Sequence, residues 1–373
     1  MLTRSSPTVV FIDDRQDELR PLADRVREAG MAGCKVDSPA DIDSNILASA
    51  DLVIVDYTLD EWIDNVGVDQ LSLKPVNGIA LASVLREHCR TPPLKHAPPT
   101  GFALITGKPD TVSMAPGEQR SHVVARLSNL EWFFEKQANA DRNVQRIVSL
   151  ASAIHELPTE FSHSMVSLDR LLNLLGVSND NELFERYRSA VGRCRPPIHH
   201  LSKDSGGIVL LRWLLHRILP HTCFLLDDFA LAARLRVTPS SLRTELVQET
   251  EFAGHLRGIM YSGPLAQFDG TRWWRSGIEQ WLWNVTGGKS ANTEAIHDTL
   301  AKMGVTQIQP VMLVRPVVTL DASLQQEEQL SSRDNVVALH LDDWPSYAEP
   351  AYARNALVAE DNQLRLFVVD DAN

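Results

Sequence analysis

Three short apolar runs, each ending in a polar side chain, constrain the fold of this chain more than any other feature. They span residues 9–14, 51–56 and 102–106. Uninterrupted apolar runs rich in β-branched residues are typical of parallel strands that are buried on both faces. In an open sheet of parallel strands, chemistry takes place outside the carboxyl ends of the strands. We therefore expect a polar site built from the residues at these ends, which are Asp13, Asp14, Asp56 and Thr106.

Length and composition limit the possible classes of protein. The 373 residues exceed one ordinary domain and predict two or three. No run approaches the roughly 20 apolar residues of a membrane span, and no signal peptide is visible, so we expect a cytoplasmic protein without a membrane partner. The net charge of −12 disfavours non-specific nucleic-acid binding by the whole chain. Four cysteines form no CxxC pair, which argues against a zinc site and a disulfide framework: Cys34, Cys89, Cys194 and Cys223.

Residues 8–136 alternate between strand and helix patterns. This alternation predicts an α/β fold with a doubly wound, five-stranded parallel sheet and right-handed crossovers. The expected strands are 8–13, 34–37, 52–55, 101–106 and 123–127, and the expected helices are 20–29, 78–88 and 129–136.

The rest of the chain predicts a mainly helical segment followed by a small α/β or α+β unit. Helical patterns occur at 144–154, 167–175, 182–191 and 208–219, and later strand candidates are 311–318, 336–341 and 364–369. The expected domains are 1–137 for the sheet, 138–225 for a helical connector or bundle, 226–288 for a helix-turn-helix-like segment, and 289–373 for the C-terminal unit.

Residues 227–246 have the pattern of a helix-turn-helix, with a short amphipathic helix, a turn and a second helix capped by Thr238 or Ser240. An Asp-Gly pair predicts a hairpin at 262–274, between apolar stretches at 252–262 and 272–274, that would serve as a wing. DNA binding is one interpretation, and a protein-binding module or simple helix packing is the other. The candidate DNA-binding residues are Ser240, Ser241, Arg243, Thr244 and Arg272.

The order of the polar strand ends resembles the receiver domain of bacterial response regulators over about residues 7–137. Four elements carry the resemblance, and each has its counterpart in the family at the same place in the strand order. They are Asp13-Asp14 after the first strand, Asp56 after the third, a helix that begins at Gly78, and Thr106 after the fourth strand.

The resemblance implies that Asp56 accepts a phosphoryl group from a histidine kinase, and that Thr106 reorients to contact this group. It also implies Mg²⁺, because a carboxylate can attack phosphorus only where a cation neutralises negative charge, and hard oxygen ligands suit this ion. A homodimer that pairs through one face is a further expectation from the resemblance. The implied Mg²⁺ ligands are Asp13, Asp14, Asp56 and the backbone carbonyl of Thr58.

Two departures from the family pattern affect the expected site. The family has a lysine followed by proline after the fifth strand, where this chain by order offers Arg126. Arginine keeps the charge but not the compact ammonium geometry. Lys108, close after Thr106, is the other candidate for that charge. The loop between Asp56 and Gly78 is longer than the family's usual turn, and we expect it to cover the site or to form a partner surface.

Three hypotheses about function remain open at this point. The first is a phosphorylation-dependent regulator whose C-terminal region binds a protein partner or DNA. The second is a receiver-like scaffold that assembles partners without phosphotransfer. The third is an enzyme whose active site lies in 290–373, although spacing alone supports no Ser-His-Asp or Cys-His arrangement and does not favour an enzyme. A salt-dependent shift with duplex DNA would favour the DNA-binding form of the first hypothesis.

Overall fold

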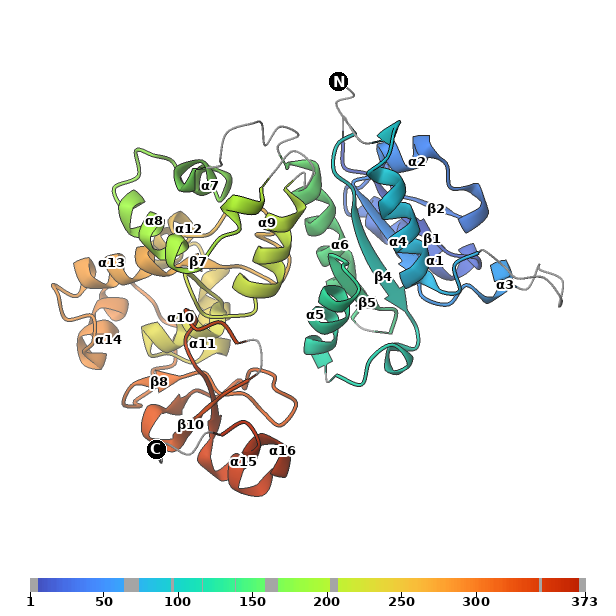
Figure 1. Cartoon of the computed structure of the whole chain (residues 1–373). Helices are drawn as coiled ribbons and strands as arrows, with labels where there is room; N and C mark the ends of the chain where they lie inside the picture. The colour runs from blue at the N-terminus through green and yellow to red at the C-terminus, as the bar shows by residue number, and fades with distance from the viewer. Residues whose placement is uncertain are drawn as a thin grey trace. The chain divides into compact units, whose positions relative to one another are not determined.

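The computed structural model describes residues 6–63, 74–94, 97–115, 117–137, 139–157, 167–201, 207–341 and 344–368. The chain forms two compact units (Figure 1). The first consists of Met1–Ser167, Pro197–His216 and Gln267–Asp269, and the second of Leu168–Pro196, Arg217–Ala266 and Gly270–Asn373. This division differs from the expected boundaries at 137, 225 and 288, because the helix after the sheet and two later segments belong with the sheet.

The first unit is built on a five-stranded sheet, formed by described residues, with the strand order β2-β1-β3-β4-β5. Every neighbouring pair is parallel, which confirms the predicted α/β class and its doubly wound sheet. Ile12 pairs with Val55 and Asp56 with Ile105, so the polar strand ends emerge at one edge. The strands are β1 Val9–Ile12, β2 Lys35–Asp37, β3 Leu52–Asp56, β4 Gly101–Thr106 and β5 Trp132–Glu135.

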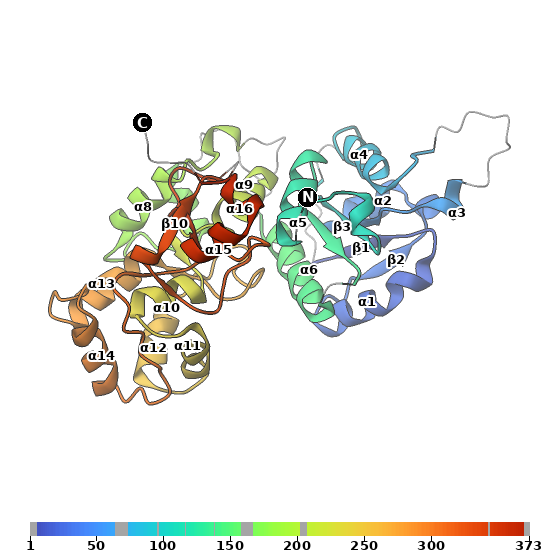
Figure 2. The same cartoon turned by 90° about the horizontal axis from the view of Figure 1, so that it is seen from below.

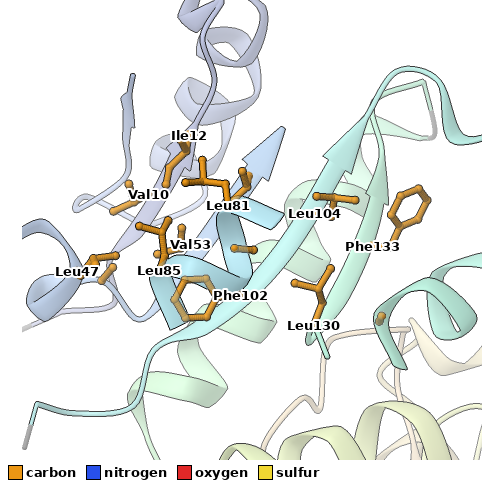
Figure 3. Close-up of a cluster of buried hydrophobic side chains, with 14 of the residues drawn as sticks. Val10, Ile12, Leu47, Val53, Leu81, Leu85, Phe102, Leu104, Leu130 and Phe133 are labelled. Carbon is orange, nitrogen blue, oxygen red and sulfur yellow. The ribbon is translucent and has the colours of Figure 1, made fainter. Parts of the chain in front are cut away.

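Helices cover both faces of this sheet, and Figure 2 shows the sheet between α1 and α4. On the α4 side, Leu81 and Leu85 pack with Val10, Val53 and other strand residues in one apolar cluster (Figure 3). Burial on both faces explains why β1, β3 and β4 are fully buried and largely apolar, whereas the edge strand β2 is only half-buried and carries Lys35 and Asp37. The helices of this unit are α1 Gln16–Glu28, α2 Ser44–Ser49, α3 Asp60–Ile63, α4 Gly78–Cys89, α5 Gly117–Leu127, α6 Ala140–His155 and α9 Ile208–Trp213.

The fifth strand lies later in the chain than the sequence predicts. The predicted strand 123–127 belongs to helix α5, and the predicted helix 129–136 contains strand β5. Val124 and Ala125 are both buried whereas Leu127 is exposed, which is a helical pattern and not the alternation of a strand. The aromatic run that begins at Trp132 is buried on both faces of the sheet, as a parallel strand requires.

The second unit is mainly helical, and its strands are short antiparallel pairs. Helices α10 and α11 follow each other across a short turn within residues 227–246, and Thr238 caps α11 by accepting a hydrogen bond from Ser241 N. Its helices are α7 Leu168–Leu174, α8 Phe184–Arg193, α10 Asp228–Leu235, α11 Pro239–Leu246, α12 Glu251–Gly258, α13 Arg275–Val285, α14 Thr293–Lys302, α15 Asn355–Glu360 and α16 Asn362–Arg365. Its strands are β6 Leu225–Leu226, β7 Trp273–Trp274, β8 Pro316–Val317, β9 Ser331–Ser332, β10 Val336–Leu339 and β11 Ala351–Arg354.

The predicted wing and the predicted strand 364–369 both differ in the structure. Most of 252–262 is helix α12, which begins where Thr250 accepts a hydrogen bond from Ala253 N, so the predicted wing is reduced to an isolated bridge between Met260 and Trp273. The predicted strand 364–369 begins inside helix α16, whose start is capped by Asp361. Residue 369 lies outside the described residues. In both cases a capping side chain satisfies the free N–H groups of a helix start.

The apolar stretch predicted as a helix at 208–219 is α9 followed by a π-helical turn, Leu214–Ile218. Pro220 then follows, and proline lacks the N–H that a continuing helix needs. Short 3₁₀ turns lie at Pro39–Asp41, Pro109–Thr111, Ile198–His200 and Arg333–Asn335. Among the described residues, no helix combines the length and the apolar character needed to cross a membrane.

Candidate functional site

The candidate site lies at the carboxyl edge of the parallel sheet. Asp13 directly follows β1, Asp56 closes β3 and Thr106 closes β4. All three side chains are buried, with exposed fractions of 1%, 4% and 1%. Burying a carboxylate is costly unless a cation or hydrogen bonds compensate for the lost hydration. The compensating groups therefore define what this site can do.

Lys136 supplies the positive charge of the site. Its Nζ atom lies 3.0 Å from Asp56 Oδ1, 3.5 Å from Asp13 Oδ2 and 2.8 Å from Glu18 Oε2. Lys136 directly follows β5, and its backbone N–H donates to the Thr106 carbonyl over 2.8 Å, which fixes it beside β4. Lys136 is thus a lysine directly after the fifth strand, and it is followed by Gln137 and not by proline.

The predicted charge partners Arg126 and Lys108 are therefore wrong. Both side chains are exposed, Arg126 near the end of α5 and Lys108 in the turn after β4. The error has one cause, because the misplaced fifth strand put the wrong residue at the strand end. The correct signal is present in the sequence, since Trp132-Phe-Phe-Glu-Lys136 is also an apolar run with a polar end.

Burial changes the protonation behaviour of the carboxylates. Burial is the main cause that raises the pKa of Asp13 to about 7, and the negative charge of Asp56 adds to it. Burial likewise raises the pKa of Asp56, and Lys136 opposes this rise. Burial lowers the pKa of Lys136, but hydrogen bonds to Glu18 and Asp56 outweigh it and leave the pKa raised. Lys136 therefore stays charged while the two carboxyls hold protons more tightly than usual.

Each buried carboxylate uses one oxygen in a local turn and directs the other toward Lys136. Asp56 Oδ2 accepts from Thr58 N over 2.9 Å, and Asp13 Oδ1 accepts from Arg15 N over 2.8 Å. The second oxygens, Asp56 Oδ1 and Asp13 Oδ2, are buried and face the Lys136 ammonium at 3.0 and 3.5 Å. Two such oxygens on hard carboxylate ligands fit a divalent cation such as Mg²⁺.

The Asp14 carboxylate makes a different contact from those of Asp13 and Asp56. Its Oδ2 atom accepts a hydrogen bond from Trp62 N over 3.1 Å, in the short helix α3. Within the described residues, no three acidic, histidine or cysteine side chains converge as a metal site. The structure thus places Asp13 and Asp56 together and ties Asp14 to the segment after Thr58. Part of the long loop, residues 64–73, lies outside the described residues.

The start of α4 fits closely against the site. Asn77 caps this helix by accepting a hydrogen bond from Ala80 N over 3.0 Å. A Cβ atom on Gly78 would lie 2.1 Å from the backbone oxygen of Asp56, so only glycine fits here. Gly78 N also donates to the Tyr57 carbonyl over 3.0 Å. The glycine that helped to identify the site therefore packs directly on Asp56.

Thr106 lies on the strand next to Asp56, as predicted. Its Oγ1 atom accepts a hydrogen bond from Lys108 N over 3.1 Å, and its hydroxyl is otherwise enclosed at the strand end. This bond connects the hydroxyl to the loop that leads to α5.

The α5 and β5 side of the first unit is covered by α9 and the residues after it. Arg212 Nε donates to Glu131 Oε1 over 2.9 Å, and Glu131 is almost completely buried. His122 on α5 lies with its Nδ1 3.0 Å from His216 Nδ1, and the His216 ring stacks on Trp132 at 6.0 Å between ring centroids. This side of the first unit is therefore covered by the chain's own residues.

Residues 267–269 complete this covering. Arg146 of α6 is buried, and its guanidinium lies over the rings of Trp132 and Phe268 at 5.1 and 5.6 Å. Its Nη2 atom is 2.6 Å from Asp269 Oδ1. Asp269 was expected in a hairpin turn, and instead it anchors its segment to α6.

The predicted DNA-binding residues in the second unit are mostly engaged inside it. Ser241 is buried, and its hydroxyl accepts from Gln309 N over 3.0 Å. Arg243 pairs with Asp228 and with Glu328, the latter over 3.0 Å, and Arg272 is buried. These contacts favour helix packing over DNA contact, and the DNA-binding role stays a prediction. The exposed candidates are Ser240 and Thr244.

No protein-family model matches the chain, and a search of curated proteins finds no match. A comparison with solved structures finds a crystal structure of the response regulator ChrA in a heme-sensing two-component system. The two chains are 13% identical, and the match covers 74% of this chain and 98% of that chain with a TM-score of 0.26. A TM-score of this size carries no argument about function, so we base the proposal on the geometry of the strand ends.

Proposed function

We propose that the first unit is a receiver-like domain in which Asp56 accepts a phosphoryl group from a histidine kinase. The observation that carries this proposal is the position of Lys136, within 3.5 Å of both Asp13 and Asp56 at the edge of a parallel sheet. Two buried carboxylates beside one ammonium are costly to keep for stability alone. They suit a site that binds a cation and a phosphoryl group.

Each residue has a distinct role in the proposed reaction. The Asp56 carboxylate attacks the phosphorus of a phosphohistidine on the kinase, so that an O–P bond forms, the P–N bond breaks, and the imidazole leaves without its phosphoryl group. Lys136 neutralises charge on the incoming group, and the Thr106 hydroxyl turns toward it. A Mg²⁺ ion held there would neutralise the remaining charge on the phosphoryl oxygens. The residues that would hold it are Asp13, Asp56 and the Thr58 carbonyl, with Asp14 beside them.

In this proposal, the structural change that follows phosphorylation is transmitted through α5 and β5. Phosphorylation would draw Thr106 away from Lys108 N and release the loop before α5. Helix α5 carries His122, which contacts His216. The C-terminal region would thus respond by binding a protein partner, in keeping with a regulator located in the cytoplasm.

The deciding experiment is phosphorylation by a small donor. The full-length protein is incubated with Mg²⁺ and acetyl phosphate, and its intact mass is measured beside Asp56→Asn and the matched control Asp60→Asn, an exposed residue of α3. We expect one added phosphoryl group in the wild type and in Asp60→Asn, and none in Asp56→Asn. A folded wild-type protein that gains no mass and binds no Mg²⁺ would refute the proposal.

A scaffold without phosphotransfer is the second candidate function. The observation that favours it is the hydrogen bond from Trp62 N to Asp14, which uses an oxygen that a metal site would need. In a scaffold, Lys136 would simply neutralise the buried acids. The same mass measurement separates the two candidates, because a scaffold without phosphotransfer gains no phosphoryl group in the wild type.

A further inference from the structure

A further acidic residue, Glu18 of α1, contacts the ammonium of the candidate site. Its Oε2 atom accepts a hydrogen bond of 2.8 Å from Lys136 Nζ, although 118 positions separate the two residues in the sequence. The Glu18 side chain is 48% exposed, whereas Asp13 and Asp56 are buried. Lys136 therefore lies between two buried acids and one acid that is open to solvent.

The start of α1 fixes the position of Glu18. Glu18 N donates to the Arg15 carbonyl over 2.9 Å, and Arg15 N donates to Asp13 Oδ1 over 2.8 Å. The next residue, Leu19, is almost completely buried and holds this turn of α1 in the first unit. The backbone of Glu18 is thus tied to the same turn that holds the Asp13 carboxylate.

The three acids around Lys136 are not equally close to it. An ammonium group has three N–H donors. Lys136 Nζ is 2.8 Å from the Glu18 carboxylate, 3.0 Å from that of Asp56 and 3.5 Å from that of Asp13. The Glu18 contact is the shortest and the Asp13 contact the longest. Lys136 can therefore move away from Asp13 and keep its hydrogen bond to Glu18.

Such a movement matters when the site holds a divalent cation. Asp13 Oδ2 and Asp56 Oδ1 both face Lys136, so the cation and the ammonium need the same two oxygens. The two positive charges also repel each other at short distance. An ammonium with no other partner would exclude the cation or leave the site. Glu18 is another partner, because its carboxylate is a separate acceptor on the exposed side of Lys136.

We propose that Glu18 is a positioning residue that holds the Lys136 ammonium at the edge of the site while a divalent cation occupies Asp13 and Asp56. This inference rests on the proposed function, because it concerns the lysine and the cation of the same reaction. Without the cation, Lys136 shares its donors among the three acids. With the cation bound, its hydrogen bond to Glu18 persists, and Lys136 stays within reach of a phosphoryl group on Asp56.

Two simpler roles for Glu18 make different predictions. A surface ion pair that only stabilises the fold would change the urea unfolding midpoint and leave the affinity for a cation unchanged. A carboxylate that attracts the cation directly would change this affinity whether or not Lys136 is present. A positioning role requires an effect on cation affinity that depends on Lys136.

The first test is a calorimetric titration of the full-length protein with Mg²⁺, without a phosphoryl donor. In Glu18→Gln the ammonium depends on the two buried acids and competes with the cation, so we expect about threefold weaker binding. Asp17→Asn is the matched control, because it removes the same charge from a neighbouring side chain that is 90% exposed. The control should bind Mg²⁺ like the wild type, and equal affinities of the wild type and Glu18→Gln would overturn the proposal.

The second test repeats the Glu18→Gln substitution in a Lys136→Met background. We expect no further change in Mg²⁺ affinity there, because the residue that Glu18 positions is absent. The same loss in both backgrounds would show that the Glu18 charge acts directly on the cation, and it would overturn the positioning role. Urea unfolding establishes that each variant is folded.

The outcomes also separate this inference from the proposed function. If the folded wild type binds no Mg²⁺, both fail. If Asp56 is phosphorylated while Glu18→Gln binds Mg²⁺ like the wild type, only the role of Glu18 is refuted.

Discussion

The Lys136 ammonium lies 3.0 Å from Asp56 Oδ1 and joins two strand ends that are 80 positions apart in the sequence. The same ammonium is 3.5 Å from Asp13 Oδ2. A cation placed between two buried acids competes for the oxygens that a divalent metal would use. Lys136 therefore both stabilises the two buried carboxylates and sets how tightly a metal can bind.

Replacing Lys136 by methionine tests this competition. Removing a unit charge about 4 Å away is worth at least about 1 kcal/mol, so we expect Mg²⁺ to bind Lys136→Met at least about fivefold more tightly. We also expect a lower yield of phosphorylated Asp56, because the incoming group loses a neutralising charge. Calorimetric titration with Mg²⁺ and intact mass after acetyl phosphate measure the two effects. Lys108→Met is the matched control, and equal changes in both variants would contradict the role of Lys136.

The sheet was predictable because its strands are buried on both faces and are therefore apolar runs. Asp13, Asp56 and Thr106 followed from the ends of those runs, and the structure places all three at one edge. Lys136 was missed because the β-branched residues of 123–127 imitate a strand, while their burial pattern is helical. The contacts of Asp269 and of Glu18 depend on residues far away in the sequence, and no local pattern contains them.

Gly78→Ala should destabilise the first unit. The added Cβ atom would lie 2.1 Å from the Asp56 backbone oxygen, and either α4 or β3 has to shift. Such overpacking costs roughly 1–3 kcal/mol. We expect a lower urea midpoint and weaker Mg²⁺ binding, since Asp56 moves with its backbone. Gly254→Ala is the control, because a Cβ there meets only the end of the Arg257 side chain at 4.0 Å.

Asp269→Asn should also lower stability. It leaves the buried Arg146 guanidinium without its carboxylate at 2.6 Å, and losing one partner of a buried ion pair costs about 3 kcal/mol. Asp110→Asn is the matched control, since Asp110 is an exposed partner of Arg120 and such pairs contribute about 0–1 kcal/mol. Urea unfolding monitored by tryptophan fluorescence compares the two. Similar losses in both variants would show that Asp269 does not hold residues 267–269 on α6.

The His122–His216 pair predicts how stability depends on pH. Burial lowers the pKa of His122 to about 4, and burial together with the charge of His122 lowers that of His216 to about 2. A histidine side chain in the unfolded chain has a pKa of about 6.5. Below this pH the two histidines bind protons in the unfolded chain but stay neutral in the folded protein. The contribution of the two histidines to the free energy of unfolding therefore has its full value above about pH 6.5 and falls as the pH decreases toward about 4.

The measurement is the urea unfolding midpoint between pH 7.5 and pH 4.5 for the wild type, His216→Gln and the control His88→Gln, whose side chain is exposed. The raised pKa of Asp13 has the opposite effect on stability, because the contribution of Asp13 to the free energy of unfolding decreases as the pH rises toward 7. That contribution is common to all three proteins and cancels in their differences. We expect a shallower decrease for His216→Gln than for the other two proteins. Parallel curves for all three would mean that the two rings are not held together in the folded protein.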